Sequence, residues 1–442
     1  MVENVTFSPT KKLFIDVLTR DISISECILD LLDNCVDSYT RNHIHETREV
    51  KLSFTPESFL ITDSCGGIPK TDFLNEVFRF GATSYSDNVS TIGVWGIGLK
   101  RSIFKLGKII DFETDDGTDY CKLHIDVEDW LKKENDWNLA LSDTHSSNLN
   151  GVKPCTKICI TKLGEEATDL FRTTLFTDNI QKTISYYYSR FINDNRIRFK
   201  VNNETIEGYE IKIISSNDYK PVKFNDKFDT VEMQIICWLH FQDAKGKVSP
   251  GGWNIYMNER LILRDDISKD TGWIGEKPYL PKYHPIYTQF RGIVFLTTNE
   301  PYKLPMNTSK TGLNTDSKVY HYMLSKMCEV SRPFINFLAT KYDKPKEDMD
   351  DSEEEISTIA SEDSNTQENP TKETNLSDTP FVATFIEPTV RKAIKSDTSI
   401  QYLKPKARVA KVRKILNVKS NVEVGSETFE YFWKSEGLND YK

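Results

Sequence analysis

The side chains best suited to chemistry form an acidic stripe near the start of the chain. Between Ser23 and Arg41 the apolar residues have helical spacing, and polar residues recur every three or four positions on another face. Like charges at that spacing oppose a helix by roughly 0.2–0.5 kcal/mol per pair. Carboxylates with an amide among them suit a hydrated Mg²⁺ and a water molecule that is to be activated. The alternative is an ordinary solvated helix face. The stripe consists of Glu26, Asp30, Asp33, Asn34 and Asp37.

A second segment combines a carboxylate with two glycines. Strand-like runs at 50–54 and 59–62 lead into Asp63, which Gly66 and Gly67 follow closely. Glycines let the backbone approach a flat ligand, while the carboxylate can accept a hydrogen bond from an exocyclic amine. The same residues also fit an ordinary tight turn.

A third segment has three glycines followed by two cations. Gly93, Gly96 and Gly98 precede Lys100 and Arg101, and a short helix is expected at 102–106. Backbone N–H groups before a helix, together with the positive charges, can surround phosphates. The segment is not a P-loop, because the Gly-Lys-Ser/Thr ending is missing. It is not a Rossmann fingerprint either, because no strand leads directly into the glycines.

In order and separation, these segments resemble the Bergerat ATP-binding fold of the GHKL superfamily. That group includes gyrase-type topoisomerases, MutL, heat-shock chaperones of the ninety-kilodalton class, MORC proteins and histidine kinases. A strand-like run at 155–160 resembles the strand that closes the adenine pocket there, and the glycine segment is most similar to that of MORC-like proteins. The resemblance implies an α+β chain in which residues 1–165 form an α/β sandwich, a mixed sheet with helices on one face.

The resemblance also implies a role for individual residues. Asp30 would be the general base, Asn34 would hold a Mg²⁺ that bridges the phosphates of ATP, and Asp63 would bind the adenine amine. The other residues would surround the nucleotide: Gly67 and Thr156 at the adenine, and Gly93, Gly96, Gly98 and Lys100 in a lid over the triphosphate that spans 85–100.

Two departures from the superfamily pattern concern hydrolysis and the adenine turn. The superfamily has Glu where this chain has Asp30, and a shorter arm matters because a small displacement can cost about 10²-fold in rate. Cys65 replaces the first Gly of the Asp-x-Gly-x-Gly turn. We therefore expect a slow Mg²⁺-dependent ATPase that acts as an ATP-driven clamp or homodimerisation switch. The alternative is an ATP-dependent binding or adaptor module that does not hydrolyse ATP.

Residues 166–342 are expected to form a second domain. The pattern predicts one helix at 169–191, whose three tyrosines would pack in the core or in a dimer, and an Asn202-Asn203 turn between strands. Such a domain is similar to the S5-like transducer of the superfamily, in which a loop lysine contacts the γ-phosphate. This likeness implies that role for Lys310, although it could also be a surface lysine in a polar loop. The other elements expected are strands at 196–201, 205–214, 231–241, 253–257 and 292–296, and a helix at 317–339 with a break or kink near Pro333.

The last hundred residues differ sharply in charge. Residues 343–380 are expected to be a disordered acidic linker, because they are rich in Asp, Glu, Ser and Thr and lack aromatic residues. Residues 381–442 are expected to be a small module, with seven Lys or Arg and no acid between 404 and 419. That basic helix could contact nucleic acid, an acidic protein partner or the acidic linker, or could simply be solvated.

Composition excludes several other classes. No apolar run approaches the roughly 18 residues that a membrane span needs, and Met1 to Lys12 lack the apolar core of a signal peptide, so a cytoplasmic location is expected. The eight cysteines show no C-x-x-C spacing, which disfavours a metal cluster. No histidine lies in a helical pattern typical of a phosphoacceptor, which argues against a histidine kinase.

Overall fold

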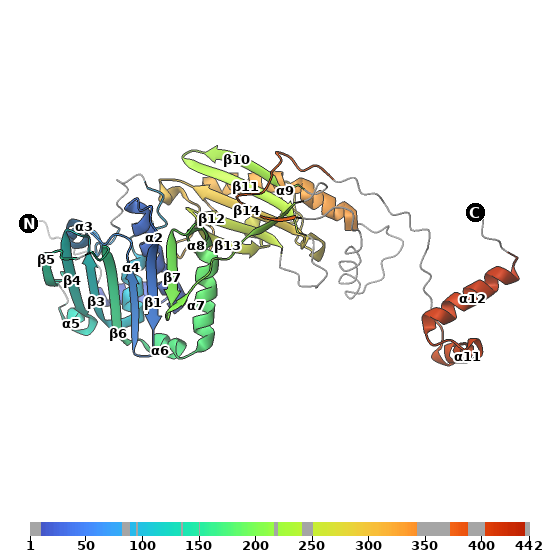
Figure 1. Cartoon of the computed structure of the whole chain (residues 1–442), viewed down its shortest axis with the longest axis horizontal. Helices are drawn as coiled ribbons and strands as arrows, with labels where there is room; N and C mark the ends of the chain where they lie inside the picture. Colours follow the sequence, from blue (N-terminus) through green and yellow to red (C-terminus); the bar gives the residue numbers. More distant parts are fainter. Residues whose placement is uncertain are drawn as a thin grey trace, which may run out of the picture. The chain divides into compact units, whose positions relative to one another are not determined.

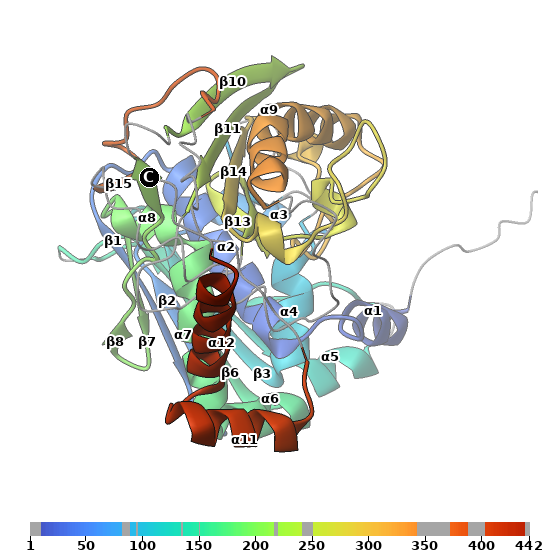
Figure 2. The same cartoon turned by 90° about the vertical axis from the view of Figure 1, so that its right-hand side faces the viewer.

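The computed structural model describes nine stretches of the chain, in two units that span Met1–Pro388 and Thr389–Lys442 (Figure 1). The first unit contains two large sheets with helices packed against them (Figures 1 and 2). The described stretches are residues 10–81, 89–93, 96–133, 136–149, 151–215, 220–240, 251–342, 372–387 and 403–437.

The first sheet has eight strands. Neighbouring strands are antiparallel except β1 and β7, which are parallel, so the sheet is mixed. In spatial order the strands are β5 (Leu141–Ser146), β4 (Asp119–Asp126), β3 (Gly107–Asp115), β6 (Cys155–Leu163), β2 (Ser58–Asp63), β1 (Arg48–Phe54), β7 (Ile197–Val201) and β8 (Glu204–Thr205).

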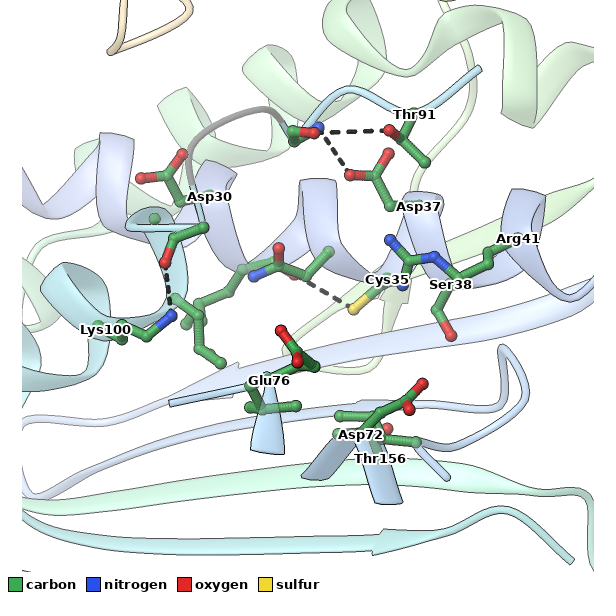
Figure 3. Close-up of a pocket in the computed structure, with 18 of the residues that line it drawn as sticks. Asp30, Cys35, Asp37, Ser38, Arg41, Asp72, Glu76, Thr91, Lys100 and Thr156 are labelled. Atoms are coloured by element: carbon green, nitrogen blue, oxygen red, sulfur yellow. Dashed lines mark hydrogen bonds between the residues drawn. The ribbon is translucent and has the colours of Figure 1, made fainter. Parts of the chain in front are cut away.

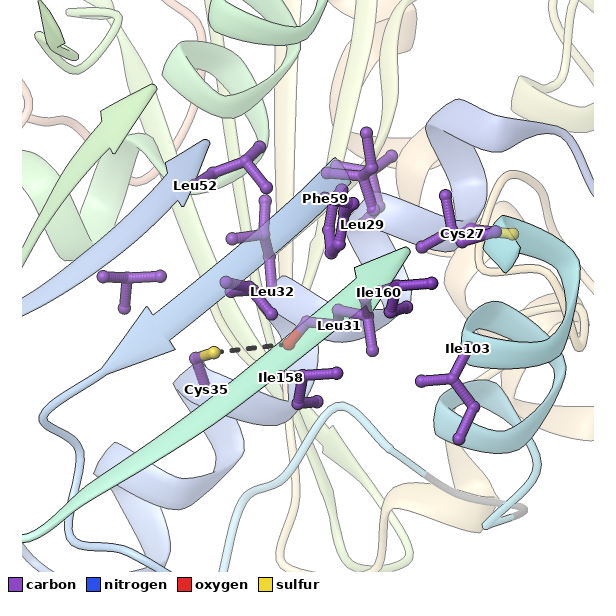
Figure 4. Close-up of a cluster of buried hydrophobic side chains, with 14 of the residues drawn as sticks. Cys27, Leu29, Leu31, Leu32, Cys35, Leu52, Phe59, Ile103, Ile158 and Ile160 are labelled. Carbon is purple, nitrogen blue, oxygen red and sulfur yellow. Dashed lines mark hydrogen bonds between the residues drawn. The ribbon is translucent and has the colours of Figure 1, made fainter. Parts of the chain in front are cut away.

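One face of this sheet is apolar and carries the helices. Along β1, Val50 and Leu52 are buried while Lys51 between them is exposed, as the alternation of a strand requires. Figure 4 shows Leu31 and Leu32 facing the strands that carry Phe59 and Ile160. The predicted α/β sandwich with helices on one face is therefore confirmed. The helices are α1 (Lys11–Leu18), α2 (Ile24–Arg41), α3 (Lys70–Asn75), α4 (Gly98–Leu106), α5 (Val127–Lys132), α6 (Glu165–Phe171), α7 (Thr174–Tyr187) and α8 (Ser189–Asn193).

The predicted end of the first domain at residue 165 needs correction. The hydrophobic core of the first sheet continues through α6, α7 and α8 as far as Ile206. These helices form a crossover that returns the chain to the sheet, where β7 pairs with β1 in parallel. The expected single helix at 169–191 is thus three helices, and the Asn202-Asn203 turn is confirmed, with φ of 48° and 71°.

The second sheet is buried on both faces. On one face lies α9 (Lys318–Tyr342), which continues through Pro333 without the predicted break. On the other face Ile213 of β9 (Lys212–Ser215) packs against Trp238 and Tyr256. The strand order is β10 (Val222–Phe228), β11 (Val231–Leu239), β14 (Phe290–Thr297), β12 (Gly252–Met257) and β13 (Arg260–Asp266), and short 3₁₀ turns lie at η2 (Lys269–Thr271), η3 (Pro285–Tyr287) and η4 (Pro301–Lys303).

Part of the predicted acidic linker is ordered against this second sheet. Strand β15 (Lys372–Asn375) pairs antiparallel with β9, and the Val382 amide donates to the Pro221 carbonyl. The centroid of the Phe385 ring lies 4.1 Å from that of the Phe334 ring of α9. The predicted boundaries at 380 and 381 are therefore wrong for residues 372–387, which belong to the first unit. Residues 343–371 of the predicted linker lie outside the described residues.

The second unit consists of two helices in the part that is described. They are α11 (Lys406–Leu416), which is the predicted basic helix, and α12 (Asn421–Ser435). Asn417 ends α11 in the left-handed conformation, and Ser420 and Glu423 form a capping box that starts α12. Across the described part of the whole chain, no helix has the length and apolar character of a membrane span.

Candidate functional site

Helix α2 supplies the acidic stripe, but its first member serves the helix itself. Ser23 and Glu26 form a capping box, in which the Ser23 amide donates to Glu26 Oε2 at 2.9 Å. Glu26 therefore satisfies the start of the helix and is not part of the site. The stripe that remains is Asp30, Asp33, Asn34 and Asp37.

The rest of the stripe is not a solvated helix face. Asp30, Asp33 and Asp37 are 3%, 0% and 5% exposed, whereas Asn34 between them is exposed. Buried carboxylates need partners, because an isolated buried charge is very costly. The solvated-face alternative is therefore wrong for the three aspartates.

Three side chains hold Asp33, and each lies at least 155 residues further along the chain. Arg260 Nε and the Tyr188 hydroxyl donate to its Oδ1, each at 2.7 Å, and Lys310 Nζ donates to its Oδ2 at 2.8 Å. Burial raises the pKa of the Asp33 carboxyl, but the charges of Arg260 and Lys310 outweigh it and leave the pKa below its usual value. Tyr188, which we assigned to packing alone, is thus also a polar partner of the site.

Asp30 lies between two cations. Arg101 of α4 approaches Asp30 Oδ2 with NH2 at 2.7 Å and Nε at 2.8 Å, and Lys310 Nζ lies 3.3 Å from Asp30 Oδ1. Burial lowers the pKa of Lys310, but the nearby charges of Asp33 and Asp30 raise it above its usual value overall. Lys310 is only 6% exposed, so the alternative of a surface lysine is wrong.

Asp37 anchors the start of the glycine segment. Its two carboxylate oxygens accept from the amides of Ile92 and Gly93, at 2.6 and 2.7 Å. Burial raises the pKa of Asp37, while these two amide bonds partly oppose the rise. Further along, a Cβ on Gly98 would lie 3.0 Å from the Asp30 carboxylate carbon, so this position favours glycine. Of the predicted lid, residues 85–88 and 94–95 lie outside the described residues.

Asp63 ends strand β2 at the opposite side of the site. The Cys65 amide donates to Asp63 Oδ1 at 2.8 Å, and Cys35 Sγ lies 3.5 Å from Oδ2. Burial raises the pKa of this carboxyl to about 6. Thr156 of β6 pairs directly with Asp63 across the strands. Gly67 has φ of +67°, and a Cβ there would come within 2.1 Å of a backbone carbonyl, so the reshaped turn requires glycine.

Lys100 adds a buried cation close to the glycine segment. Its ammonium donates to the Gly96 carbonyl and lies 5.4 Å from the centre of the Phe80 ring. Burial lowers the pKa of Lys100 to about 8, which leaves it mostly charged at neutral pH.

One cavity of about 460 Å³ connects these groups. In Figure 3, Asp30 and Asp37 project from α2, Thr156 lies on the sheet and Lys100 lies at one end. The second sheet's side of the unit contributes Asn299, Thr308 and Lys310 to the lining. All ten residues predicted for the site line this cavity: Asp30, Asn34, Asp63, Gly67, Gly93, Gly96, Gly98, Lys100, Thr156 and Lys310.

The donors and acceptors of the cavity fit a nucleotide. Its volume lies in the usual range of roughly 300–1,000 Å³ for small-molecule sites. Asp63 offers a carboxylate acceptor at one side, while Lys100, Arg101 and Lys310 offer positive charge at the other. Asn34 exposes the one uncharged amide of the stripe to the cavity, where it could join a Mg²⁺. Within the described residues, no group of three or more His, Cys, Asp or Glu side chains is placed to hold a metal ion.

Sequence reasoning missed Arg260, the buried partner of Asp33. The only local signal is an arginine at the start of the apolar run Arg260-Leu261-Ile262-Leu263, directly after Asn258-Glu259. A charged residue there can equally mark a strand edge, so the signal does not identify a partner 227 residues away.

A family model built from known proteins matches the first part of the chain. Residues 22–158 match the family model described as "Histidine kinase-, DNA gyrase B-, and HSP90-like ATPase". The match runs from α2 to the first part of β6, and therefore includes Asp30, Asn34, Asp63 and Thr156 but not Lys310. No curated protein matches the chain.

Proposed function

We propose that this chain, whose residues 22–158 carry a GHKL-type ATPase domain, binds Mg²⁺-ATP and uses it as a conformational switch between its two sheets. The observation that carries the proposal is the shared cavity. Groups suited to the adenine ring and to the phosphates of ATP converge there. One of them, Lys310, comes from the second sheet's side. Asp63 would accept from the adenine amine, and Asn34 would hold the metal.

Hydrolysis is proposed to be slow because of the state of Asp30. Bound ATP supplies a phosphoanhydride bond that water can cleave. A general base must accept a proton from that water, but both oxygens of Asp30 are engaged by Arg101 and Lys310. Asp30 can serve only when Lys310 has moved, and its side chain is one methylene shorter than Glu. Both features lower the rate of hydrolysis.

The switch is proposed to act through Lys310. Its ammonium joins a loop of the second sheet's domain to two aspartates of α2. A ligand that contacts Lys310 differently in two arrangements shifts the balance between them. The five-stranded mixed sheet with α9 on one face supports an S5-like transducer, and the glycine segment supports a MORC-like lid. By analogy with such proteins, we propose that closure favours a homodimer.

Binding without hydrolysis is the second candidate. The ion pairs of Asp30 with Arg101 and Lys310 favour it, because they occupy the candidate base in the structure. In that case ATP would be a structural ligand that orders the cavity for a partner.

The basic helix is proposed to bind a polyanionic partner. α11 has five Lys or Arg among eleven residues and no acid. Nucleic acid and an acidic protein surface both fit this charge, and weaker binding at higher salt is expected for either.

A single-turnover assay with radiolabelled ATP and Mg²⁺ tests the proposal. We expect slow phosphate release that Asn34→Ala abolishes, because the metal ligand is lost. Asn179→Ala is the control, since Asn179 is also an exposed helical asparagine but lies in α7 and does not line the cavity. ATP that binds and stays intact for hours would favour the second candidate. Absence of ATP binding would refute both.

A further inference from the structure

The turn between β12 and β13 inserts successive side chains into the first sheet's domain. Asn258 and Glu259 have φ of 44° and 69°, which suits a tight hairpin. Asn258 Nδ2 donates to the Thr91 carbonyl at 2.6 Å, just before the glycine segment. Glu259 pairs with Arg190 at 3.3 Å and with Arg196, whose NH1 lies 3.0 Å from Oε1. The contacts of Asn258 and Glu259 thus hold the turn against the first sheet's domain directly before Arg260.

Arg260 follows directly and makes two different contacts. Its Nε donates to Asp33 Oδ1 at 2.7 Å, and its NH1 donates to the main-chain carbonyl of Lys310 at 2.9 Å. The side chain is 1% exposed and lies against the Tyr187 ring. A planar guanidinium has donors in fixed directions and can make both contacts at once. A lysine ammonium has a single nitrogen and does not present two donors in this fixed geometry.

The backbone of Lys310 depends on such support. Its φ is 58°, in the left-handed region that residues with a side chain rarely adopt. Its amide donates to the Asn307 carbonyl at 3.0 Å, and its carbonyl accepts from Arg260. The contact with Arg260 therefore helps to define the direction in which the Lys310 ammonium points.

Within ion-pair distance, three cations share two carboxylates, and Asp37 adds a more distant negative charge that Lys310 also feels. Asp30 and Asp33 face Arg101, Arg260 and Lys310. If the Lys310 ammonium moved away, Asp33 would keep Arg260 and the Tyr188 hydroxyl, and Asp30 would keep Arg101. Lys310 is the cation that the network can release toward a further anion.

We propose that Arg260 is the positioning residue for Lys310. By holding Asp33 and the Lys310 carbonyl together, it lets the Lys310 ammonium exchange between Asp33 and the terminal phosphate of a bound nucleotide. This inference rests on the proposed function. It assigns a role to a residue outside the part of the chain that the family model matches.

Calorimetric titration with ADP and with a non-hydrolysable ATP analogue tests this role. Arg260→Lys keeps the positive charge beside Asp33 but loses the second contact. We expect about a tenfold or larger loss in affinity for the analogue, the range for one hydrogen bond to a charged group, and a change of less than about twofold for ADP. Lys310→Ala should give the same loss, and the double variant should lose no more than either single variant.

Two further variants keep the test decisive. Arg264→Lys is the control, because Arg264 lies on the same strand against Tyr186 and is half exposed; it should change neither affinity. Arg260→Gln leaves Lys310 as the only cation that contacts Asp33 among the described residues, and it should give the same loss of preference for the ATP analogue over ADP. Thermal unfolding reports whether each variant folds.

The outcomes separate the inference from the proposed function. Full preference for the analogue in folded Arg260→Lys or Arg260→Gln would overturn the role of Arg260. Losses that add up in the double variant would do the same, because they would show that the two residues act independently. If the wild-type protein binds neither nucleotide, or both equally, the proposed function fails first and the inference falls with it.

Discussion

Replacing Asp63 with asparagine should weaken nucleotide binding and stabilise the protein at the same time. The carboxylate is buried, and its partners among the described residues are the Cys65 amide and the thiols of Cys35 and Cys65. An asparagine oxygen can still accept from the Cys65 amide. Its NH₂ group, however, would face the adenine amine in place of an acceptor.

The binding and stability effects can be estimated separately. Loss of a hydrogen bond to a charged group costs roughly 1.5–3 kcal/mol, or about 10- to 150-fold in ATP affinity, with a smaller loss for GTP. Burial raises the pKa of Asp63 from its usual 3.8 to about 6, so the folded state binds this proton more tightly than the unfolded state. Above pH 6 the ionised carboxylate therefore costs about 3 kcal/mol of stability, from about 1.4 kcal/mol per pKa unit.

The direction of the pH effect follows from the higher pKa of Asp63 in the folded protein. As pH falls from above 6 to below 3.8, Asp63 becomes protonated first in the folded protein, and its cost disappears. Asp63→Asn should thus raise the free energy of unfolding at pH 8, with a gain that shrinks to nothing near pH 4. ATP affinity of the wild-type protein should itself fall below pH 6.

Calorimetry with ATP and GTP, and urea unfolding at pH 8 and pH 4, measure these effects. Asp72→Asn is the control, because Asp72 also lines the cavity but is exposed, and it should change little. Unchanged ATP affinity in Asp63→Asn would remove this residue from the adenine site. A loss of stability at pH 8 would show that the carboxylate is held by favourable contacts and would refute the pKa argument.

Other perturbations test the phosphate side and the outer sheet. Asp30→Ala should keep ATP binding and abolish hydrolysis. Asp30→Glu should raise the rate of hydrolysis toward the roughly 10²–10⁴-fold contribution of a general base. Phosphate release that persists in Asp30→Ala would exclude Asp30 as that base. Because burial lowers the pKa of Lys100 to about 8, ATP affinity should fall between pH 7 and pH 9 in the wild-type protein, and a calorimetric series on Lys100→Met should lack that fall. Phe385→Ala should lower the free energy of unfolding by about 1–2 kcal/mol, less than a fully buried Phe, and should expose residues 372–387 to protease; equal cleavage of both proteins would contradict the docking of this segment.

The sequence contains the local elements of the site because each has its own periodicity or composition. The helical spacing around Asp30 and Asn34 predicts α2, and the glycines at 93, 96 and 98 mark the segment that must approach buried carboxylates. The resemblance to the GHKL pattern, and not the residues by themselves, implies that Asp63 and Thr156 share one site, and in the structure their strands pair directly.

Long-range partners could not be predicted in the same way. Nothing local shows that Arg260 pairs with Asp33, or that β7 joins β1 across a three-helix crossover. The docking of β15 could not be predicted for a related reason. Its charged surroundings indicate a linker, whereas its order comes from backbone pairing with β9, which has no compositional signal.

We propose that Lys310, which lies on the second sheet's side of the cavity, distinguishes ATP from ADP. The most direct measurement is the affinity of the wild-type protein and Lys310→Ala for ADP and for a non-hydrolysable ATP analogue, each with Mg²⁺. We predict tighter binding of the analogue to the wild-type protein, and equal affinities for the two ligands in Lys310→Ala. Equal affinities already in the wild-type protein, or an undiminished preference in Lys310→Ala, would contradict the account.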